Sequence, residues 1–423
     1  MRKAKLFHAG KLLLIVLLIV SAVFLARASG YYDSFFRRLP DAGSAQSESV
    51  EETQELSATA LAAAVRPRTV LVCTRDGVIT ASAYAGEETE EAFHRFSAIL
   101  GEALGSAGEP TEIGEQEFRA GIEKGCVFLD LSCGAPLELL AAWLGSEMAG
   151  PAASVQTRTL YLGLADTTAQ LCYRDGEGRF FRCSTAAVSE ALSARMDEFE
   201  GSAAGFAYAD RTLKNLDPYA IMLTSLPEFP GVDGSAVRDG LDAAQLQQTL
   251  GMNSFVASTY IEADGTKVFI EGSKTLRLSP DGTVNYRADA GEGERAFAEG
   301  LPAAVSYAYA AALRSIGACA GEADIVFSGV VHDGADSYTV TFDYCIGSVP
   351  LRLPAGSAAQ FVMKNGRIAD ARLMLRSYVC TDGTECVLPM RQAAAIAAVS
   401  GITPTLAYAD SGEQISCVWV RDE

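Results

Sequence analysis

The sequence predicts an α+β protein: a single N-terminal transmembrane helix, then an α/β domain, then an α+β domain built on an antiparallel sheet. Three observations lead to this class. An uncharged apolar run from Leu12 to Ala26 follows a basic N-terminus. Strand-like and helix-like segments alternate between residues 66 and 245, which is typical of mixed α and β packing. Beyond residue 245, short alternating strands are joined by tight turns, which favours antiparallel hairpins.

The apolar run has two interpretations. Basic residues precede it, so the N-terminus should stay cytoplasmic and the chain after Gly30 should be extracytoplasmic. As a helix, the run spans about 22 Å of a hydrocarbon core of about 30 Å. Flanking Lys11 and Arg27 can snorkel to the interface, so an anchor is feasible. The small residues Ala26 and Ala28 also form an A-x-A cleavage site, which would give a secreted protein beginning at Ser29.

The composition divides the chain into four parts. We expect a cytoplasmic tail and transmembrane helix over 1–30, and a flexible acidic stalk over 31–65, because residues 41–60 are rich in Ser, Ala and acids without an apolar period. The α/β domain follows over 66–245 and the α+β domain over 246–423. After residue 40 the chain holds 27 basic against 52 acidic residues, a balance that repels phosphate and excludes a nucleic-acid partner.

Within the α/β domain, two strands should flank the Arg75-Asp76-Gly77 turn and an amphipathic helix should begin at Glu87. A buried strand from Cys126 leads through a loop ending at Pro136 into a second helix. Three more strands and a closing helix follow, at 158–166, 169–175, 178–185 and 187–199. The proline-rich and glycine-rich stretch 226–240 marks the approach to the domain boundary.

In the α+β domain, the loop Pro280-Asp281-Gly282 is predicted to be a three-residue hairpin turn with Gly282 in the left-handed region. That register places Leu278 opposite Val284 and Leu276 opposite Tyr286 on one face. A helix or broken helix pair, a strand, an Asn-Gly hairpin, a second helix and two final strands follow, over 293–317, 336–347, 361–378, 388–399, 405–410 and 415–420. A helix followed by antiparallel strands thus occurs twice, which suggests a degenerate internal repeat.

Two cysteine pairs flank hairpin-like sequences and are candidates for disulfides, namely Cys380 with Cys386 and Cys172 with Cys183. Whether either pair can form a disulfide depends on the length of the loop between its strands. A three-residue loop would set Cys380 opposite Cys386, whereas a two-residue Asp-Gly turn would set it opposite Glu385. The segment from Cys172 to Cys183 leaves the same choice open. Buried free thiols are the alternative for both pairs.

No local signature of catalysis or metal binding stands out. The three histidines, His8, His94 and His332, are far apart in the sequence, and the chain has no C-x-x-C pair. It also lacks the G-x-S-x-G, S-x-x-K and H-E-x-x-H motifs. We therefore predict a protein that is not an enzyme, with no catalytic, cofactor-binding or metal-ligating residues and no cofactor, which works by contact.

Two groups of motifs carry a family resemblance. The run CVFLDLSCGAPLELLAAWLG together with LYLGLADTTAQLCYRDGEGRFFRCST resembles the amino-terminal part of the YycH regulators of the YycFG (WalKR) two-component system. The C-terminal run VFIEGSKTLRLSPDGTVNYRA, SYTVTFDYCIGSVPLRL and AAQFVMKNGRIADARLMLRSY, with the closing LAYAD and VWV, resembles the ectodomain module shared by YycH and YycI. The resemblance covers most of residues 66–423.

The resemblance implies an accessory membrane protein of Gram-positive bacteria. Such a protein binds a sensor histidine kinase through its transmembrane helix and ectodomain, and adjusts signalling for cell-wall homeostasis. A YycI-type sister protein is a further expected partner. The alternative is a cleaved, secreted hydrolase or soluble binding module. For an anchored protein, the expected kinase-contacting helix face comprises Leu14, Leu17, Leu18, Ser21 and Leu25, with Ser21 its polar member.

Overall fold

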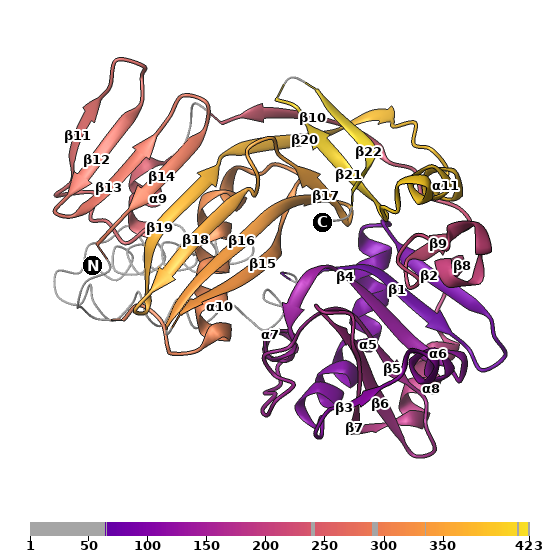
Figure 1. Ribbon diagram of the computed structural model, residues 1–423. Coiled ribbons are helices and arrows are strands. Elements are labelled where there is room, and N and C mark those ends of the chain that lie inside the picture. Colours follow the sequence, from indigo (N-terminus) through magenta and orange to yellow (C-terminus); the bar gives the residue numbers. More distant parts are fainter. Residues whose placement is uncertain are drawn as a thin grey trace, which may run out of the picture. The chain divides into compact units, whose positions relative to one another are not determined.

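The computed structural model describes residues 64, 66–237, 242–289, 295–334, 336–412 and 414–421 (Figure 1). The predicted transmembrane helix and stalk lie outside these residues. The described chain is α+β, as predicted, with seven α-helices and mostly antiparallel sheets. We call residues 66–226 the N-lobe and residues 230–421 the C-lobe, because each carries its own large sheet.

The N-lobe sheet has nine strands in the order β3-β7-β6-β5-β4-β1-β2-β8-β9. Every strand pair in it is antiparallel. The predicted α/β class of this domain is therefore wrong, and the N-lobe is itself α+β. Three of its neighbouring pairs, β1–β2, β5–β6 and β6–β7, are joined by short turns, which are too short for a parallel crossover. The strands are β1 (Pro67–Cys73), β2 (Ile79–Ala83), β3 (Thr111–Ile113), β4 (Cys126–Pro136), β5 (Gln156–Gly163), β6 (Thr168–Asp175), β7 (Phe180–Val188), β8 (Ser202–Phe206) and β9 (Ile221–Leu223).

Four helices accompany this sheet, and the longest begins where the sequence predicts it. Helix α5 buries Phe93, Phe96 and Leu100, which recur at helical spacing, and its first turn is acidic, as the helix dipole favours. These side chains join Phe128 of β4 in the core of the N-lobe. The helices are α5 (Glu87–Gly105), α6 (Glu115–Glu123), α7 (Leu137–Trp143) and α8 (Ser189–Asp197), followed by the 3₁₀ turns η2 (Ala207–Ala209) and η3 (Arg211–Leu213).

Strand β10 (Pro230–Ala236) lies in the stretch that the sequence predicts as an approach to the domain boundary. It pairs with β20 (Arg376–Thr384) in a two-stranded sheet. Strand pairing therefore passes from the N-lobe sheet to C-lobe partners between β9 and β10. The division of the chain into domains at residue 245 remains a prediction.

The C-lobe sheet runs in the order β11-β12-β13-β14-β19-β18-β16-β17-β21-β22, with β15 also paired to β16. Its pairs are antiparallel except β17 with β21, which is parallel. Its strands are β11 (Ser258–Ile261), β12 (Lys267–Glu271), β13 (Lys274–Leu278), β14 (Thr283–Arg287), β15 (Asp324–Gly334), β16 (Ser337–Ile346), β17 (Val349–Arg352), β18 (Ala359–Lys364), β19 (Arg367–Met374), β21 (Pro404–Asp410) and β22 (Ile415–Arg421).

The predicted hairpin registers of the C-lobe are confirmed. Leu278 lies opposite Val284, and Leu276 opposite Tyr286. Gly282 has a φ of 86°, the left-handed conformation that the three-residue loop requires. The turn between β18 and β19 has positive φ at both Asn365 and Gly366, as the type I′ signal predicts.

Helix α10 covers one face of the C-lobe sheet (Figure 1). Tyr309 of α10 packs on Phe342 of β16 with ring centroids 5.7 Å apart. Tyr338, Val340 and Tyr344 share the buried face of β16 with Phe342, as their alternation predicts. The C-lobe helices are α9 (Ala243–Thr249), α10 (Leu301–Ser315), the 3₁₀ turn η4 (Gly317–Cys319) and α11 (Met390–Ser400). Helix α11 followed by the β21–β22 hairpin repeats the order of α10 and its strands, but a common origin remains a prediction.

Candidate functional site

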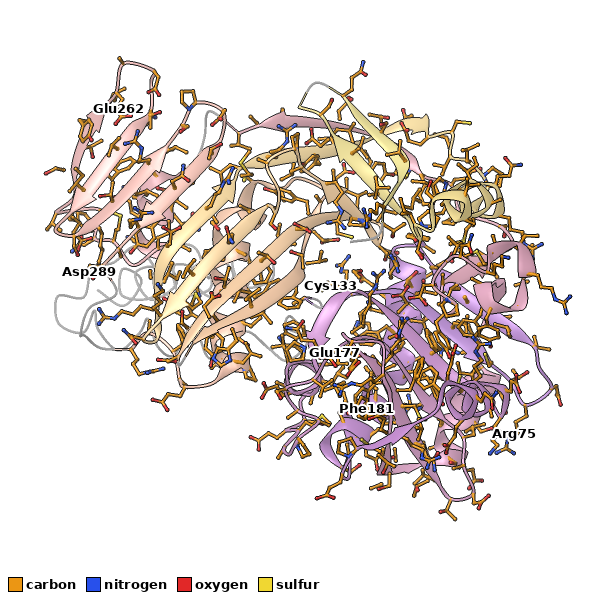
Figure 2. All side chains as sticks on the ribbon, in the orientation of Figure 1. Arg75, Cys133, Glu177, Phe181, Glu262 and Asp289 are labelled. Atoms are coloured by element: carbon orange, nitrogen blue, oxygen red, sulfur yellow. The ribbon has the colours of Figure 1, made fainter. Side chains whose placement is uncertain are left out.

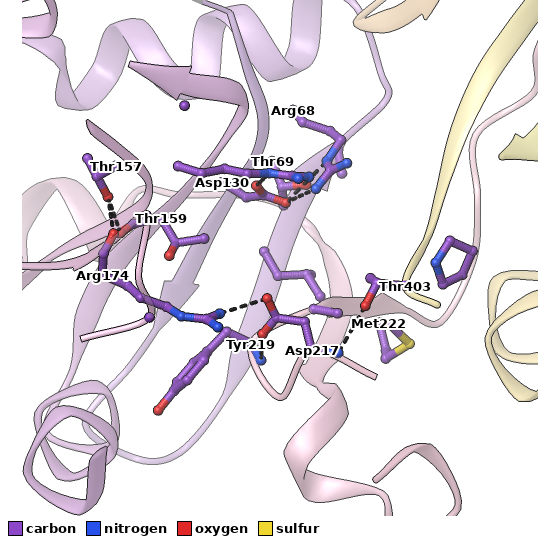
Figure 3. Close-up of a pocket in the computed structure, with 18 of the residues that line it drawn as sticks. Arg68, Thr69, Asp130, Thr157, Thr159, Arg174, Asp217, Tyr219, Met222 and Thr403 are labelled. Atoms are coloured by element: carbon purple, nitrogen blue, oxygen red, sulfur yellow. Dashed lines mark hydrogen bonds and ion pairs between the residues drawn. The ribbon is translucent and has the colours of Figure 1, made fainter. Parts of the chain in front are cut away.

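A cavity of about 260 Å³ is lined by strands of the N-lobe and by residues at the starts of α11 and β21 (Figure 3). Arg68 of β1 donates from Nε and Nη2 to Asp130 Oδ2 of β4, at 3.1 and 2.5 Å. Its Nη1 donates to Thr405 Oγ1 of β21 at 2.5 Å. Arg158 Nε of β5 reaches Asp130 Oδ1 at 3.2 Å. Arg68 and Asp130 are both buried, so two guanidinium groups compensate the desolvation of this carboxylate.

A second ion pair lines the same cavity. Figure 3 shows Arg174 of β6 directed toward Asp217, with Nη1 and Oδ2 2.7 Å apart. The backbone N–H of Asp217 donates to Thr403 Oγ1 at 2.9 Å, immediately before β21. The Arg174 guanidinium also lies 6.0 Å from the centroid of the buried Tyr219 ring. Asp217 is therefore hydrogen-bonded to a C-lobe residue, Thr403, just as Arg68 is hydrogen-bonded to Thr405.

Asp175, at the end of β6, is the third carboxylate of the cavity lining. Burial acts to raise its pKa, but hydrogen bonds from the Arg179 side chain and from the backbone N–H groups of Glu177 and Arg179 outweigh that effect, so the pKa lies below its ordinary value. Since each of the three carboxylates accepts from an arginine, the arrangement suits a structural junction better than proton transfer. We call the contacts between the two lobes the seam; those described so far are Arg68 with Thr405 and Asp217 with Thr403.

The start of the described chain belongs to the seam. Phe327 N of β15 donates to Ala64 O at 2.9 Å, and Arg66 Nη1 pairs with Asp324 Oδ2 at 2.8 Å and with Glu90 Oε1 at 2.5 Å. Figure 2 labels Cys133 on β4, whose thiol donates to Phe327 O at 3.3 Å. The chain just before β1 is therefore bound to a C-lobe strand as well as to the N-lobe.

The exposed edge strand of the C-lobe sheet is a second candidate site. In Figure 1, β11 is the outermost strand of its sheet. All four of its residues are exposed, and Tyr260 and Ile261 are 47% and 67% exposed. Phe255 and Val256, just before the strand, are 93% and 63% exposed. We call Phe255, Val256, Tyr260 and Ile261 the β11 patch. Figure 2 places Glu262 beside it at the tip of the β11–β12 hairpin.

The direction of the backbone hydrogen bonds decides which N–H and C=O groups of β11 are free to pair with another strand. Glu262 N donates to Thr266 O, so the backbone groups of Glu262 point toward β12. Because direction alternates along an antiparallel strand, those of Thr259 and Ile261 point outward. The ends of the two large sheets other than β11 differ among the described residues: β3 and β9 are three residues long, and β22 lies against β10, where Ile415 packs on Gly234. Strand β15, which in the described part of the chain pairs only with β16, is a further edge. The edge of β11 is thus both exposed and open to pairing.

The predicted hairpin between Cys172 and Cys183 forms, as β6 and β7. Cys172 lies opposite Arg182, and Cys183 lies opposite Leu171, so the two side chains leave opposite faces of the sheet. Both thiols are free in the structure. This register opposes a bridge, although the prediction has yet to be tested by chemistry.

The predicted hairpin at Cys380 and Cys386 is wrong. Strand β20 continues through the Asp-Gly sequence and pairs with β10, where a register shift accommodates the extra residues. Pairing to a distant strand has overridden the local turn signal. Cys380 and Cys386 are both free thiols, and Cys386 is exposed.

The predicted kinase-contacting residues Leu14, Leu17, Leu18, Ser21 and Leu25 all lie outside the described residues. Among the residues that are described, every helix falls short of the length and apolar character that a membrane crossing requires. The same residues contain no group of three or more His, Cys, Asp or Glu side chains placed to hold a metal ion.

The fold and these sites define an α+β protein of two lobes, joined by a paired polar seam and bearing an exposed edge strand. Among solved structures, the chain is similar to the crystal structure of YycH from Bacillus subtilis, with a TM-score of 0.54 and 10% sequence identity. The similarity covers 85% of this chain and 94% of that chain. The YycH-type fold predicted from the sequence motifs is therefore confirmed. No family model matches the chain, and no curated protein sequence matches it either.

Proposed function

We propose that this protein is a membrane-anchored regulator, without enzymatic activity of its own, that binds a sensor histidine kinase of the YycFG type and adjusts two-component signalling for cell-wall homeostasis in a Gram-positive bacterium. The observation that carries the proposal is the YycH fold, which extends over nearly the whole of the solved YycH chain. That likeness does not favour the alternative of a secreted hydrolase or soluble module.

The anchor in this proposal is the apolar run that follows the basic N-terminus, with the chain after Gly30 outside the cell. The helix face with Leu14, Leu17, Leu18, Ser21 and Leu25 would contact a kinase helix in the membrane. A YycI-type protein would be a second partner. Intact mass and N-terminal sequencing of the protein from membrane and medium fractions test the anchor: a membrane form beginning near Met1 is expected, and a soluble form beginning at Ser29 would contradict it.

For the ectodomain contact, we propose that an extended segment of the kinase's extracytoplasmic region adds a strand to β11. Edge strands of this kind are normally protected by Lys, Pro or a covering loop, because their unpaired N–H and C=O groups recruit other chains. The residues of β11 are Ser258, Thr259, Tyr260 and Ile261, none of which is a charged or proline gatekeeper. The β11 patch supplies apolar contact area beside the edge.

Charge indicates the character of the added strand. The chain beyond residue 40 carries a large excess of acids, and Asp264 is exposed in the turn that follows β11. We therefore expect a segment with alternating apolar side chains and flanking basic residues, because opposite charge guides the encounter and like charge opposes it.

Photo-crosslinking from the β11 edge in the native cells tests this contact. A photoreactive residue at Thr259 or Ile261 in the full-length protein should capture the kinase, whereas one at Val399, which is 87% exposed on α11, should not. The matched variants are Thr259→Pro, which removes an outward N–H, and Thr259→Ala, which keeps it. Loss of capture with proline alone supports strand addition.

Two results would count against the β11 contact. Capture from Val399 with none from β11 would move the ectodomain interface to α11. Equal capture by both Thr259 variants would remove backbone pairing from the mechanism. The membrane contact is tested separately, by replacing Leu17 and Ser21 with bulky residues: unchanged co-purification with the kinase would contradict the proposed helix face.

A further inference from the structure

We propose that Cys73 and Cys126 form a disulfide modification site that links β1 to β4 at one end of the N-lobe sheet. The two cysteines are direct cross-strand partners in the β1–β4 register. In the strand registers of the described residues, no other two cysteines face each other in this way. The proposal does not depend on kinase binding.

The spacing of these residues follows from the hydrogen-bond pattern. Thr74 N donates to Val78 O, so the backbone groups of Thr74 face β2 and those of Cys73 face β4. Leu164 N donates to Gly125 O, so the groups of Gly125 face β5 and those of Cys126 face β1. Cys73 and Cys126 are therefore a hydrogen-bonded antiparallel pair, whose Cα atoms lie about 5.5 Å apart. Disulfides span Cα separations of about 4.4–6.8 Å, which this pair meets, and Cβ separations of about 3.5–4.5 Å. Opposed cross-strand Cβ atoms lie about 4.5–5.5 Å apart, so the two strand ends must move closer together as the bond forms.

The side chains are also close. Both residues are buried, with exposed fractions of 3% and 0%, and both thiols are free in the structure. Burial raises the pKa of the Cys126 thiol well above its ordinary value, and the neighbouring Cys73 thiol raises it further. Cys172 and Cys183 differ, because they leave opposite faces of their hairpin.

The chemistry requires a disulfide as oxidant, either a small molecule such as glutathione disulfide or a thiol–disulfide oxidoreductase. The Cys73 thiolate attacks one sulfur of the oxidant and releases the first thiol as leaving group. Cys126, once deprotonated, then attacks Cys73 Sγ in the mixed disulfide and releases the second thiol. The protein loses two protons and two electrons, and the oxidant becomes two thiols. Because both groups are buried, we expect the reaction to accompany folding or opening of the strand ends.

Equilibration with glutathione tests the site directly. The full-length protein is refolded in buffers with an increasing ratio of glutathione disulfide to glutathione, then denatured, alkylated and mapped by mass spectrometry. We expect one peptide pair joined through Cys73 and Cys126, with two hydrogens fewer, that separates on reduction. Full alkylation of both cysteines in the most oxidising buffer would overturn the proposal.

Serine variants distinguish a specific Cys73–Cys126 bridge from oxidation of the cysteines in general. Cys73→Ser and Cys126→Ser should each abolish the linked peptide pair, while Cys172→Ser should leave it. Should a serine variant fail to fold, the linked peptides of the wild-type protein still decide the matter. A bridge that joins Cys73 or Cys126 to Cys172 instead would also overturn the assignment, because Cys172 is another thiol near Cys126. Kinase capture is measured separately, so failure of one proposal leaves the other intact.

Discussion

Trp143 of α7 and Phe327 of β15 pack edge to face, with ring centroids 5.2 Å apart and ring planes inclined by 75°. Both are buried, and they add an apolar contact to the seam. Edge-to-face pairs of this kind add about 0.5–1.5 kcal/mol beyond the burial of their area.

Phe327→Ala is therefore expected to lower the free energy of unfolding by about 3–5 kcal/mol, since it leaves a cavity against Trp143. Phe255→Ala, at a position 93% exposed, is the matched control and should change stability by less than about 0.5 kcal/mol. Urea unfolding monitored by tryptophan fluorescence measures both. Similar values for the two variants would show that the seam does not contribute to global stability.

Asp130→Asn leaves the buried Arg68 guanidinium beside a neutral amide. We expect a loss of about 3–5 kcal/mol, because the buried Arg68 charge loses its carboxylate partner in a desolvated site. Glu117→Gln, in the exposed pair of Glu117 with Arg182, should cost no more than about 1 kcal/mol. Chemical denaturation compares the two, and a small effect at Asp130 would mean that water reaches Arg68.

Gly282 and Gly272 allow a matched test of turn strain. Both have positive φ, so alanine at either is expected to cost about 1–2 kcal/mol. A Cβ at Gly282 would lie 2.6 Å from Leu375 O, whereas nothing lies within 4 Å of one at Gly272. Gly282→Ala should therefore cost a further 1–3 kcal/mol or so. Thermal unfolding of both variants checks this order, and equal losses would contradict the close approach to Leu375.

Cys380 and Cys386 should differ in thiol reactivity. Burial, with the hydrogen bond and charge of Glu322, raises the pKa of Cys380 to about 11. The thiolate is the reactive form, so at pH 8 iodoacetamide should label the exposed Cys386 first. Labelling of Cys380 should then rise ~tenfold per pH unit up to about pH 11, because its thiolate fraction grows in that proportion.

Glu322→Gln provides the control for Cys380. It removes the neighbouring negative charge, so the Cys380 pKa should fall and labelling at pH 8 should become faster. Equal labelling of both thiols in the wild-type protein would contradict the expected pKa difference. If neither thiol is labelled until reductant is added, the predicted Cys380–Cys386 bridge exists after all, despite the pairing of β20 with β10.

Local patterns predicted much of this fold. The register of the β13–β14 hairpin follows from Pro280 and Gly282, because turn geometry is encoded within a few residues. The prediction of an α/β class for the N-lobe was wrong, although the sequence held evidence against it. Strands β6 and β7 are joined by a short turn that contains Asp175-Gly176, and only an antiparallel pair allows so short a turn. Alternation of helices and strands outweighed that turn in the prediction.

Pairings between distant segments could not be predicted in the same way. Nothing in the sequence near Cys380 indicates that β10 will lie beside it, so the local Asp-Gly signal was misleading. The Arg68–Asp130 pair was equally hidden among 53 acidic residues. Cys73 and Cys126 face each other only once the register of β1 and β4 is known. The open edge of β11 likewise becomes evident only when the rest of the sheet is in place.

The contact between Ala64 and Phe327 also has a mechanical consequence. Tension applied to the chain from its N-terminal side would reach the Ala64–Phe327 hydrogen bond and the Arg66–Asp324 ion pair before it reached β1. A pull from that direction would therefore be shared between the two lobes instead of peeling β1 from its sheet.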